Sequence, residues 1–444
     1  MIQKILIANR GEIAARIIRT CKKMNIKTVA VYSEADSEAP FVKMADESFL
    51  LGAPQVTESY LNLEKIIEIA KKAQVDAIHP GYGFMSENSS FATRCKEENI
   101  IFIGPKADVL DKMGDKITAR SLMQQAGVPV IPGTEDAVES VDEAVLIAEK
   151  IGYPIMLKAS AGGGGIGLQI VHQEEELIKS FDRNSERAQS FFGNGTMFIE
   201  KYVPNARHIE IQVLADEHGN VVHLFERECS IQRRNQKVLE EAPSTFISEK
   251  TRTKMGEAAV KAAKEIGYTN AGTIEFLVDE NEQFYFLEMN TRIQVEHPIT
   301  EEITDIDLIE QQIHIASGKE LSFTQTDVTM KGHAMEARIY AEDPKTFFPS
   351  PGTISTYEEP KNSNLRIESA IEANSKVTPF YDPMIAKLIA TGKSREQAII
   401  YLKEGLQNFK IEGIKTNIPM LLRVIEHEQF KRGNVTTNFV KEHL

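Results

Sequence analysis

The first hundred residues alternate strand signals with helix signals, and this pattern constrains the fold of the chain more than any other feature. Four short apolar segments are typical of buried strands, at residues 5–8, 28–32, 77–79 and 100–103. Helix signals lie between them, at residues 11–23, 63–72 and 90–97. Strands that alternate with helices in this way predict a doubly wound parallel sheet.

The turn after the first strand raises the question of a dinucleotide site. Asn9-Arg10-Gly11-Glu12 occupies the place where such a turn would lie, but the three-glycine fingerprint is absent. An NAD-binding interpretation of the N-terminal sheet is therefore weak.

Two further units are expected after the first. The second covers residues 115–325, and the stretch of low hydrophobicity at 317–331 is typical of a linker. The third covers residues 332–444 and includes an amphipathic helix over 394–409. With residues 1–114 as the first unit, the sequence predicts three domains, which 444 residues are enough to form.

Composition restricts the partners and the compartment. The chain has 51 basic and 65 acidic residues, a formal net charge of −14, which disfavours a broad nucleic-acid or anionic-membrane surface. Cys21, Cys95 and Cys229 are too few and too scattered for a disulfide framework or a zinc site, which suits a reducing cytosol. No signal peptide and no apolar stretch of the roughly 20 residues needed to span a membrane is evident. We expect a soluble cytoplasmic protein.

A run of alternating polar residues marks the first candidate site. Every second residue from 288 to 296 carries a polar group: Glu288, Asn290, Arg292, Gln294 and Glu296. An extended strand would bring all five side chains to one face. Such alternation more often belongs to a solvent-facing strand, but three charges of mixed sign and two amides indicate a functional face.

The preceding segment suggests a metal site. Residues 271–279 and 284–290 flank a polar run, as the two strands of a hairpin would. A turn centred between Asn281 and Glu282 would place Glu275 directly opposite Glu288, where two like charges are destabilising. Carboxylates with the amide oxygen of Asn290 suit Mg²⁺ or Mn²⁺. A one-residue slip in register would put the two carboxylates on opposite faces.

A glycine-rich loop and two lysines suggest phosphate binding. The loop contains Gly162, Gly163, Gly164, Gly165 and Gly167, lies between two apolar strand signals, and lacks the Gly-Lys-Ser/Thr of a Walker loop. Dense glycine lets backbone N–H groups converge on an anion, although a flexible hairpin tip is an equal alternative. Lys158 directly before the loop and Lys116 are candidate counter-charges, although either alone is more often a solvated surface lysine.

A basic run lies farther along the chain. Residues 230–237 concentrate three cations and several amides within an acidic protein, which would attract nucleotide phosphate or bicarbonate. Residues 207–212 form a neighbouring strand with alternating polar side chains. Cys229 has no evident base nearby and is more consistent with an inert thiol than with a nucleophile. Together these features favour metal-assisted transfer from a nucleotide.

Nine motifs in one order point to a family. They are residues 5–13 (ILIANRGEI), 79–88 (HPGYGFMSEN), 102–105 (FIGP), 162–167, 207–212 (RHIEIQ), 232–243 (QRRNQKVLEEAP), 288–298 (EMNTRIQVEHP), 349–352 (PSPG) and 381–387 (YDPMIAK). The chain thereby resembles biotin carboxylase of the ATP-grasp superfamily over essentially its whole length. The resemblance implies a central ATP-grasp domain with a mobile lid at about 132–202 and a C-terminal α+β domain.

The resemblance also implies the reaction and its participants. ATP, Mg²⁺ (or Mn²⁺) and bicarbonate would be used to carboxylate biotin on a separate biotin carboxyl carrier protein, by way of carboxyphosphate. The chain lacks the Ala-Met-Lys-Met type of sequence that accepts biotin, so a separate carrier and a carboxyltransferase are the implied partners, with a homodimer as the usual state.

Residue roles follow from the resemblance by position. The implied metal ligands are Glu275, Glu288 and Asn290. The implied ATP-binding residues are the glycine loop with Lys116, Lys158, Glu200, Lys201, Val203, His208, Gln232 and Asn235. Bicarbonate would be held by Lys237, Arg292, Gln294 and the backbone of Val295. Glu296 matches the general base that deprotonates bicarbonate, and Arg338 matches the cation that stabilises the biotin enolate. With Lys237 and Arg292, these two make up the implied catalytic set.

Departures from the family pattern keep alternatives open. Ile166 and Gln169 stand where the family usually has basic residues, and Asn235 stands where histidine is common. A weakly active paralogue with a structural role, or another ATP-grasp ligase that activates a carboxylate, are therefore the competing hypotheses. A dinucleotide oxidoreductase is the third and weakest.

Overall fold

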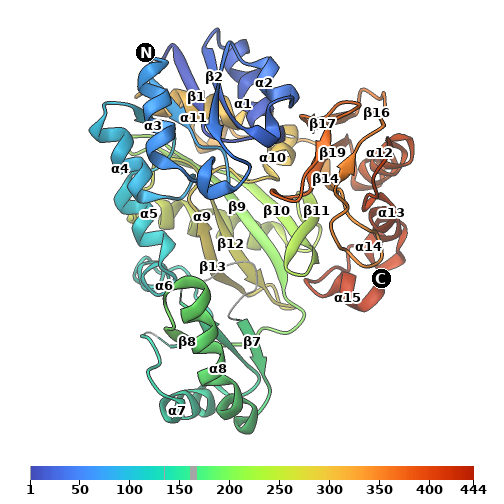
Figure 1. The fold of residues 1–444 in the computed structure, drawn as a ribbon. Helices are drawn as coiled ribbons and strands as arrows, with labels where there is room; N and C mark the ends of the chain where they lie inside the picture. Colours follow the sequence, from blue (N-terminus) through green and yellow to red (C-terminus); the bar gives the residue numbers. More distant parts are fainter. Residues whose placement is uncertain (1, 135, 161–167) are drawn as a thin grey trace.

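The computed structural model describes residues 2–134, 136–160 and 168–444 (Figure 1). Its N-terminal part contains a parallel five-stranded sheet in the order β3-β2-β1-β4-β5. The strands are β1 (Lys4–Ile7), β2 (Lys27–Ser33), β3 (Glu47–Gly52), β4 (Ala77–His79) and β5 (Ile101–Phe102). The main helices are α1 (Gly11–Lys23), α3 (Leu63–Lys72), α4 (Ser89–Glu97) and α5 (Ala107–Gly114).

Alternate residues of β1 supply the two cores of this sheet. Ile5 and Ile7 pack with α1 in one buried cluster, whereas Leu6 packs with α3 and α4 in another. Helices on both faces confirm the predicted doubly wound sheet. The edge strand β3 was not predicted, because its residues are mostly only partly buried or exposed and its apolar pattern is weak.

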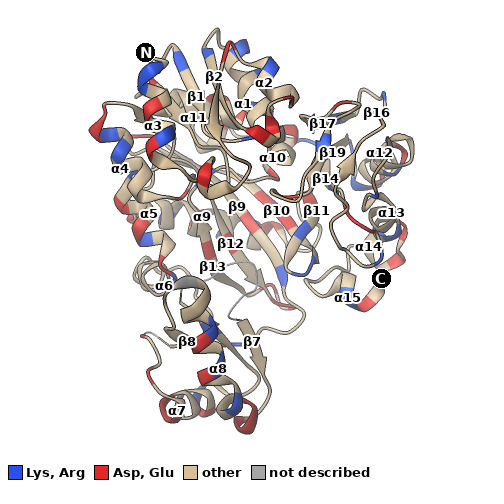
Figure 2. Cartoon of the chain, in the orientation of Figure 1, with Lys and Arg blue, Asp and Glu red and all other residues tan. Residues whose placement is uncertain are grey.

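The centre of the molecule is an antiparallel sheet of eight strands, in the order β13-β12-β9-β10-β11-β14-β19-β17. Its strands are β9 (Arg207–Ala215), β10 (Val221–Arg233), β11 (Gln236–Ala242), β12 (Asn270–Val278), β13 (Phe284–Asn290), β14 (His333–Tyr340), β17 (Leu365–Ser369) and β19 (Met384–Gly392). The sheet continues from the predicted second unit into the predicted third unit through the pairing of β11 with β14. Figure 2 shows acidic residues on several of these strands as well as on the outer helices.

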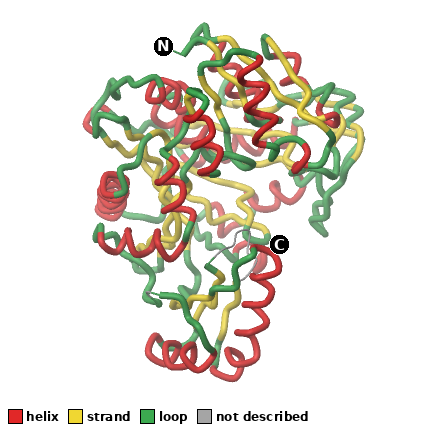
Figure 3. Tube along the Cα trace, turned by 60° about the vertical axis from the view of Figure 1, so that its left-hand side comes forward, coloured by secondary structure: helices red, strands yellow, loops and turns green. Residues whose placement is uncertain are grey.

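A small layered unit projects from one end of the molecule, at the bottom of Figures 1 and 3. It contains the antiparallel strands β7 (Leu168–Val171), β6 (Ile155–Ala159) and β8 (Met197–Lys201), with helices α7 (Val141–Ile151) and α8 (Glu174–Phe192). Leu157, Leu177 and Ile199 belong to its separate core. The glycines predicted to bind phosphate, Gly162 to Gly167, lie outside the described residues, as does Ile166.

Helices pack on both sides of the central sheet. They are α6 (Lys116–Gln125), α9 (Glu249–Glu265), α10 (His297–Thr304), α11 (Leu308–Ala316), α12 (Arg395–Asn408), α13 (Ile418–Glu426) and α15 (Phe439–His443). The amphipathic helix expected over 394–409 is α12, which packs on β14 and β19 through Ala398, Leu402 and Leu406. Within the described part of the chain, every helix is too short or too polar to cross a membrane.

Candidate active site

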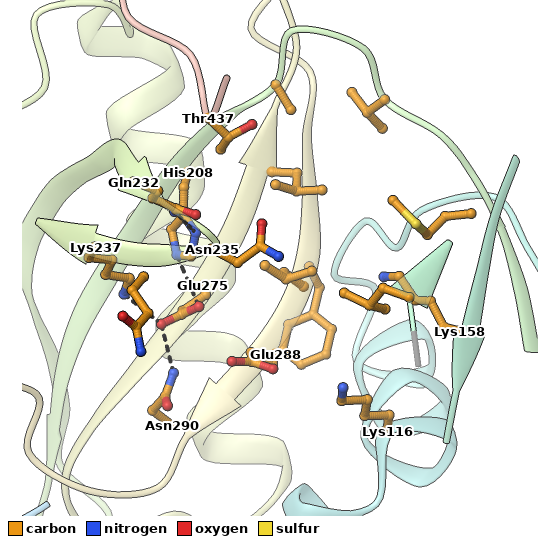
Figure 4. Close-up of a pocket in the computed structure, with 18 of the residues that line it drawn as sticks. Lys116, Lys158, His208, Gln232, Asn235, Lys237, Glu275, Glu288, Asn290 and Thr437 are labelled. Carbon is orange, nitrogen blue, oxygen red and sulfur yellow. Dashed lines mark hydrogen bonds and ion pairs between the residues drawn. The ribbon is translucent and has the colours of Figure 1, made fainter. Parts of the chain in front are cut away.

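One cavity of about 510 Å³ lies between the central sheet and the projecting unit. Its walls contain every predicted site residue outside the glycine loop: Lys116, Lys158, Glu200, Lys201, Val203, His208, Gln232, Asn235, Lys237, Glu275, Glu288, Asn290, Arg292, Gln294, Val295, Glu296 and Arg338. Figure 4 shows the lysines of the projecting side facing the carboxylates of the sheet across this space. Residues more than 200 positions apart are thus brought together.

The two carboxylates predicted to face each other do so. Glu275 on β12 and Glu288 on β13 are register partners, as the hairpin predicted. Glu275 accepts hydrogen bonds from Asn290 Nδ2 at 2.8 Å and Gln294 Nε2 at 2.7 Å, and it lies 2.9 Å from His208 Nε2. Glu288 makes no such contact with any described residue, and burial together with Glu275 raises its pKa. An uncompensated carboxylate beside a second one, with an amide oxygen adjacent, is a donor set that fits Mg²⁺ or Mn²⁺.

Lys237 is the centre of the charge network. Its ammonium lies 2.6 Å from Glu210, 2.8 Å from Glu275 and 2.7 Å from Glu296. Burial opposes the charge of Lys237, but the three carboxylates outweigh it and raise its pKa well above the usual value. Glu296 is buried too, which favours its neutral form, yet Lys237 and Arg338 hold the pKa of Glu296 at about 2. Glu296 is therefore ionised at neutral pH and able to accept a proton.

Arg338 closes the network on the side of the C-terminal strands. Its Nη2 atom lies 3.0 Å from Glu296 Oε2 and 2.6 Å from Glu240 Oε1. Glu296 directly precedes helix α10 and so sits where the chain turns from the polar segment into that helix. Lys387 on β19 donates to the carbonyl of Val295 at 2.6 Å and fixes the neighbouring backbone.

The polar segment 291–296 does not continue β13. Only Glu288 and Asn290 of the alternating run lie in the strand, and the rest lie in the turn that leads to α10. Arg292 still faces the cavity, where its Nη2 donates to Asn290 Oδ1 at 2.7 Å, and its Nε donates to Glu87 at 2.9 Å. The prediction of a single extended face was therefore wrong for the second half, although the side chains converge.

The opposite wall carries the predicted phosphate contacts. Lys116 is the first residue of α6, and burial lowers its pKa. Lys158 on β6 forms an ion pair with Glu200 on β8, and Arg120 of α6 lies 3.0 Å from the same carboxylate. Glu200 thus ties β6 and α6 together at the edge of the cavity. Lys201 donates to the carbonyl of Gly152 at 2.7 Å, and this bond holds β8 to the end of α7.

His208 and Gln232 form the next part of the wall. Burial would lower the pKa of His208, but the carboxylate of Glu275 outweighs it and raises the pKa to about 9. Gln232 Nε2 lies 3.1 Å from His208 Nδ1 (Figure 4). Asn235 has a φ of 63° in the tight turn between β10 and β11, a conformation that asparagine tolerates well.

Gln169 does not face the cavity. Its Oε1 accepts from Asn184 Nδ2 at 2.8 Å and Arg183 Nη2 at 3.2 Å, both on α8, whereas the preceding Leu168 lines the cavity. Adjacent strand residues point to opposite sides. The position of Gln169 does not support the hypothesis that a basic residue is missing there from above the phosphates, and this hypothesis stays a prediction.

Family comparisons agree along the whole chain. Residues 1–110 match the biotin carboxylase N-terminal domain, residues 115–324 the ATP-binding domain of the carbamoyl-phosphate synthase L chain, and residues 336–442 the biotin carboxylase C-terminal domain. Biotin carboxylase 2 of Bacillus subtilis is 61% identical over 444 residues and is covered completely, as is this chain. The chain belongs to the biotin carboxylase family.

Other relatives extend the likeness within the biotin carboxylase family. The biotin carboxylase of Halalkalibacterium halodurans is 60% identical over all of this chain and 98% of its own length. A biotin carboxylase–β-γ-ATP complex from Campylobacter jejuni superimposes with a TM-score of 0.98 at 49% identity, covering 100% of this chain and 99% of that one.

A second structure gives the ligands of a relative. The biotin carboxylase domain dimer of Hydrogenobacter thermophilus 2-oxoglutarate carboxylase, in complex with MgADP, ADP and bicarbonate, has a TM-score of 0.97 at 48% identity, covering 100% of this chain and 98% of that one. These findings confirm the family, the fold class and an ATP-dependent ligase that carboxylates biotin. They do not support the competing hypotheses.

Some residues of the biotin carboxylase site were not predicted. Glu210 is fully buried and bridges Lys237 and Arg227, whose Nη2 also donates to Gln294 at 2.5 Å. The alternation of residues 207–212 was a signal for Glu210, because His208 and Glu210 share one face of β9. No alternation of this kind marked Arg227, because β10 is buried over most of its length.

Proposed function

We propose that this chain uses Mg-ATP and bicarbonate to carboxylate biotin through the residues of this cavity. The observation that carries the assignment of roles is the connection from Lys237 through Glu296 to Arg338, beside the facing carboxylates Glu275 and Glu288. It joins a metal-binding donor set, an ionised base and a guanidinium within hydrogen-bonding reach.

Bicarbonate is activated at the network of Lys237. Lys237, Arg292, Gln294 and the Val295 backbone hold the anion, and Glu296 takes its proton so that it attacks the γ-phosphate of ATP. A carboxylate with a pKa of about 2 is a weak base. A bound anion that draws Lys237 toward itself weakens the hold of this lysine on Glu296 and raises the pKa of Glu296 toward a useful value.

ATP lies across the other half of the cavity. Lys116, Lys158 and the glycines 162–165 and 167 hold its phosphates, and the residues around the base and ribose are Glu200, Lys201, Val203, His208, Gln232 and Asn235. Glu275, Glu288 and Asn290 would hold Mg²⁺ or Mn²⁺, which neutralises phosphate charge when bound. We assign residues 132–202 as a lid that closes over the nucleotide, since this unit has its own core.

Biotin is deprotonated and carboxylated beside Arg338. Carboxyphosphate breaks down to CO₂ and phosphate, the phosphate takes the N1′ proton, and Arg338 stabilises the negative oxygen of the enolate. A fixed guanidinium held by two carboxylates is suited to this task, because it need not reorganise when charge develops.

The subunit names of several relatives, and the dimer of one of them, support the proposed assembly. A biotin carboxyl carrier protein and a carboxyltransferase are the proposed partners, a homodimer the proposed state, and the cytoplasm the proposed location. The proposed domains are residues 1–114, 115–325 and 332–444.

The proposal is tested by ADP release from the purified chain with Mg-ATP and bicarbonate, with and without free biotin. Biotin should stimulate release, and labelled bicarbonate should appear in carboxybiotin. Absence of stimulation, even with a biotinylated carrier protein, would contradict the proposed function.

A further inference from the structure

Two carboxyl groups behind the cavity have no role in the reaction described above. Glu240 on β11 and Glu336 on β14 are register partners, and both are completely buried. Directly opposite residues on antiparallel strands have Cβ atoms about 4.5–5.5 Å apart and share one face of the sheet. Neither residue lines the cavity. Two negative charges so close and so deeply buried would strongly oppose folding.

The cations around the pair reach only one of its members. Arg338 lies 2.6 Å from Glu240, whereas Glu336 has no ion pair with any described residue. The oxygens of both carboxyl groups lack a hydrogen-bond partner among the described residues, so the ion pair with Arg338 is what distinguishes Glu240. Lys387 lies on the neighbouring strand β19, opposite Arg338. Its ammonium is occupied by the carbonyl of Val295 at 2.6 Å and by Glu12 at 3.3 Å.

The titratable groups on the neighbouring elements supply no further positive charge to Glu336. On α10, burial and Lys387 lower the pKa of His297 well below its usual value, so this imidazole is neutral. On β10, burial raises the pKa of the Cys229 thiol, and on β14 it raises that of the Tyr340 hydroxyl, so both groups are neutral. Lys237 is shared by three other carboxylates, and Glu296 adds negative charge.

We propose that Glu240 and Glu336 hold one proton between them, carried by Glu336, and that the carboxylate of Glu240 orients Arg338 toward Glu296. The proton belongs to Glu336 because only Glu240 has a cation in contact. In agreement, burial raises the pKa of Glu336 well above its usual value, while Arg338 limits that of Glu240 to about 7. Glu240 is thus a positioning residue that acts through Arg338, and this part of the inference depends on the proposed function.

The functional test compares Glu240→Gln with Glu336→Gln. Glu240→Gln removes one of the two anchors of Arg338, and we expect carboxylation of free biotin to fall about tenfold, because the guanidinium loses its buried ion pair with Glu240. Bicarbonate-dependent ATP cleavage without biotin should stay within about twofold. Glu336→Gln copies the protonated side chain, and both rates should stay within about twofold. Equal losses in both reactions for Glu240→Gln, or a tenfold loss for Glu336→Gln, would overturn the proposal.

The second test is thermal unfolding and does not depend on activity. The pKa of Glu336 is higher in the folded state, so this group lowers stability increasingly as the pH rises above its unfolded pKa, about 4.3. Glu336→Gln should therefore raise the unfolding temperature, and the gain should be larger at pH 8 than at pH 5.5. A loss of stability, or a gain equal at both pH values, would overturn the shared proton even if the chain proved inactive.

Discussion

The two ends of the cavity differ in how far their charged side chains are already paired. At the end proposed for bicarbonate, Lys237 contacts three carboxylates and Arg338 contacts two. At the phosphate end Lys158 is paired with Glu200. Lys116 and Glu288 are partly buried there, yet neither makes an ion pair or hydrogen bond with a described residue. Lys116 and Glu288 thus depend on the nucleotide and its metal for the charge partners that Lys237 and Arg338 already have within the protein.

This difference separates two ways of building an active site. A preorganised charge network needs no reorganisation during the reaction and stabilises the fold, so changes there should damage both chemistry and stability. Unpaired, desolvated groups cost stability until a ligand arrives, so changes there should weaken ligand binding while leaving the free protein as stable or more stable.

The largest effect is expected at the preorganised end. Glu296→Gln removes the only proposed base, and bicarbonate-dependent ATP cleavage should fall about a thousandfold or more. Binding of Mg-ATP, measured by calorimetry, should stay near normal because Glu296 belongs to the other end. Loss of nucleotide affinity in this variant would contradict the assignment of Glu296 to the bicarbonate end alone.

Arg338→Ala should separate the two half-steps of the reaction. Without the guanidinium, carboxylation of biotin should fall about a hundredfold, the cost of losing one oxyanion-stabilising donor. Bicarbonate-dependent ATP cleavage without biotin should fall much less. Both rates are measured on the same preparation, with labelled bicarbonate and ADP release, and equal losses would remove Arg338 from the biotin side.

The facing carboxylates test the comparison through stability. The pKa of Glu275 lies well below its usual range, because Lys237 and His208 outweigh burial, so its charge adds stability above its unfolded pKa. The pKa of Glu288 is raised, so its charge costs stability over the same pH range. At pH 7.5 without metal, Glu275→Gln should lower the unfolding temperature by about 5 °C and Glu288→Gln should raise it by about 2 °C.

Lowering the pH should remove the difference in unfolding temperature between these two variants. Near pH 4 the unfolded chain also protonates its carboxyls, and the gain from Glu288→Gln should vanish. The loss from Glu275→Gln should shrink as well. If both variants shifted the unfolding temperature in the same direction at pH 7.5, the proposed difference between a paired Glu275 and an unpaired Glu288 would be contradicted.

The pattern of the two strand segments was enough to predict that Glu275 and Glu288 face each other. The structure shows that this pairing depends on a bulge. Val278 pairs with Phe284, so the hairpin near its turn is centred on Asn281, half a residue from the predicted centre. A bulge between Glu275 and Phe276 restores the predicted register, and without it Glu275 would face Leu287. A bulge of this kind leaves no clear mark in the sequence.

Contacts between distant strands could not be predicted in the same way. Arg227 binds Glu210 and Gln294, which lie 17 and 67 residues away, and Glu240 meets Glu336 only because β11 pairs with β14. The family motifs identified which residues belong to the site. They did not predict which of those residues are paired and which are left without a partner, because that depends on the register of the whole sheet.

The smallest effect is expected at Gln169, which the sequence singled out. A basic residue is usual at this position in the family, yet the side chain of Gln169 lies against α8 and not over the cavity. Gln169→Arg should therefore change the KM for ATP by less than about twofold, whereas Lys116→Gln should raise it about tenfold by removing a direct phosphate contact. The KM values are measured by ADP release at saturating bicarbonate and biotin. A tenfold fall in KM for Gln169→Arg would show that residue 169 reaches the phosphates when ATP binds. The phosphate end of the cavity would then include β7.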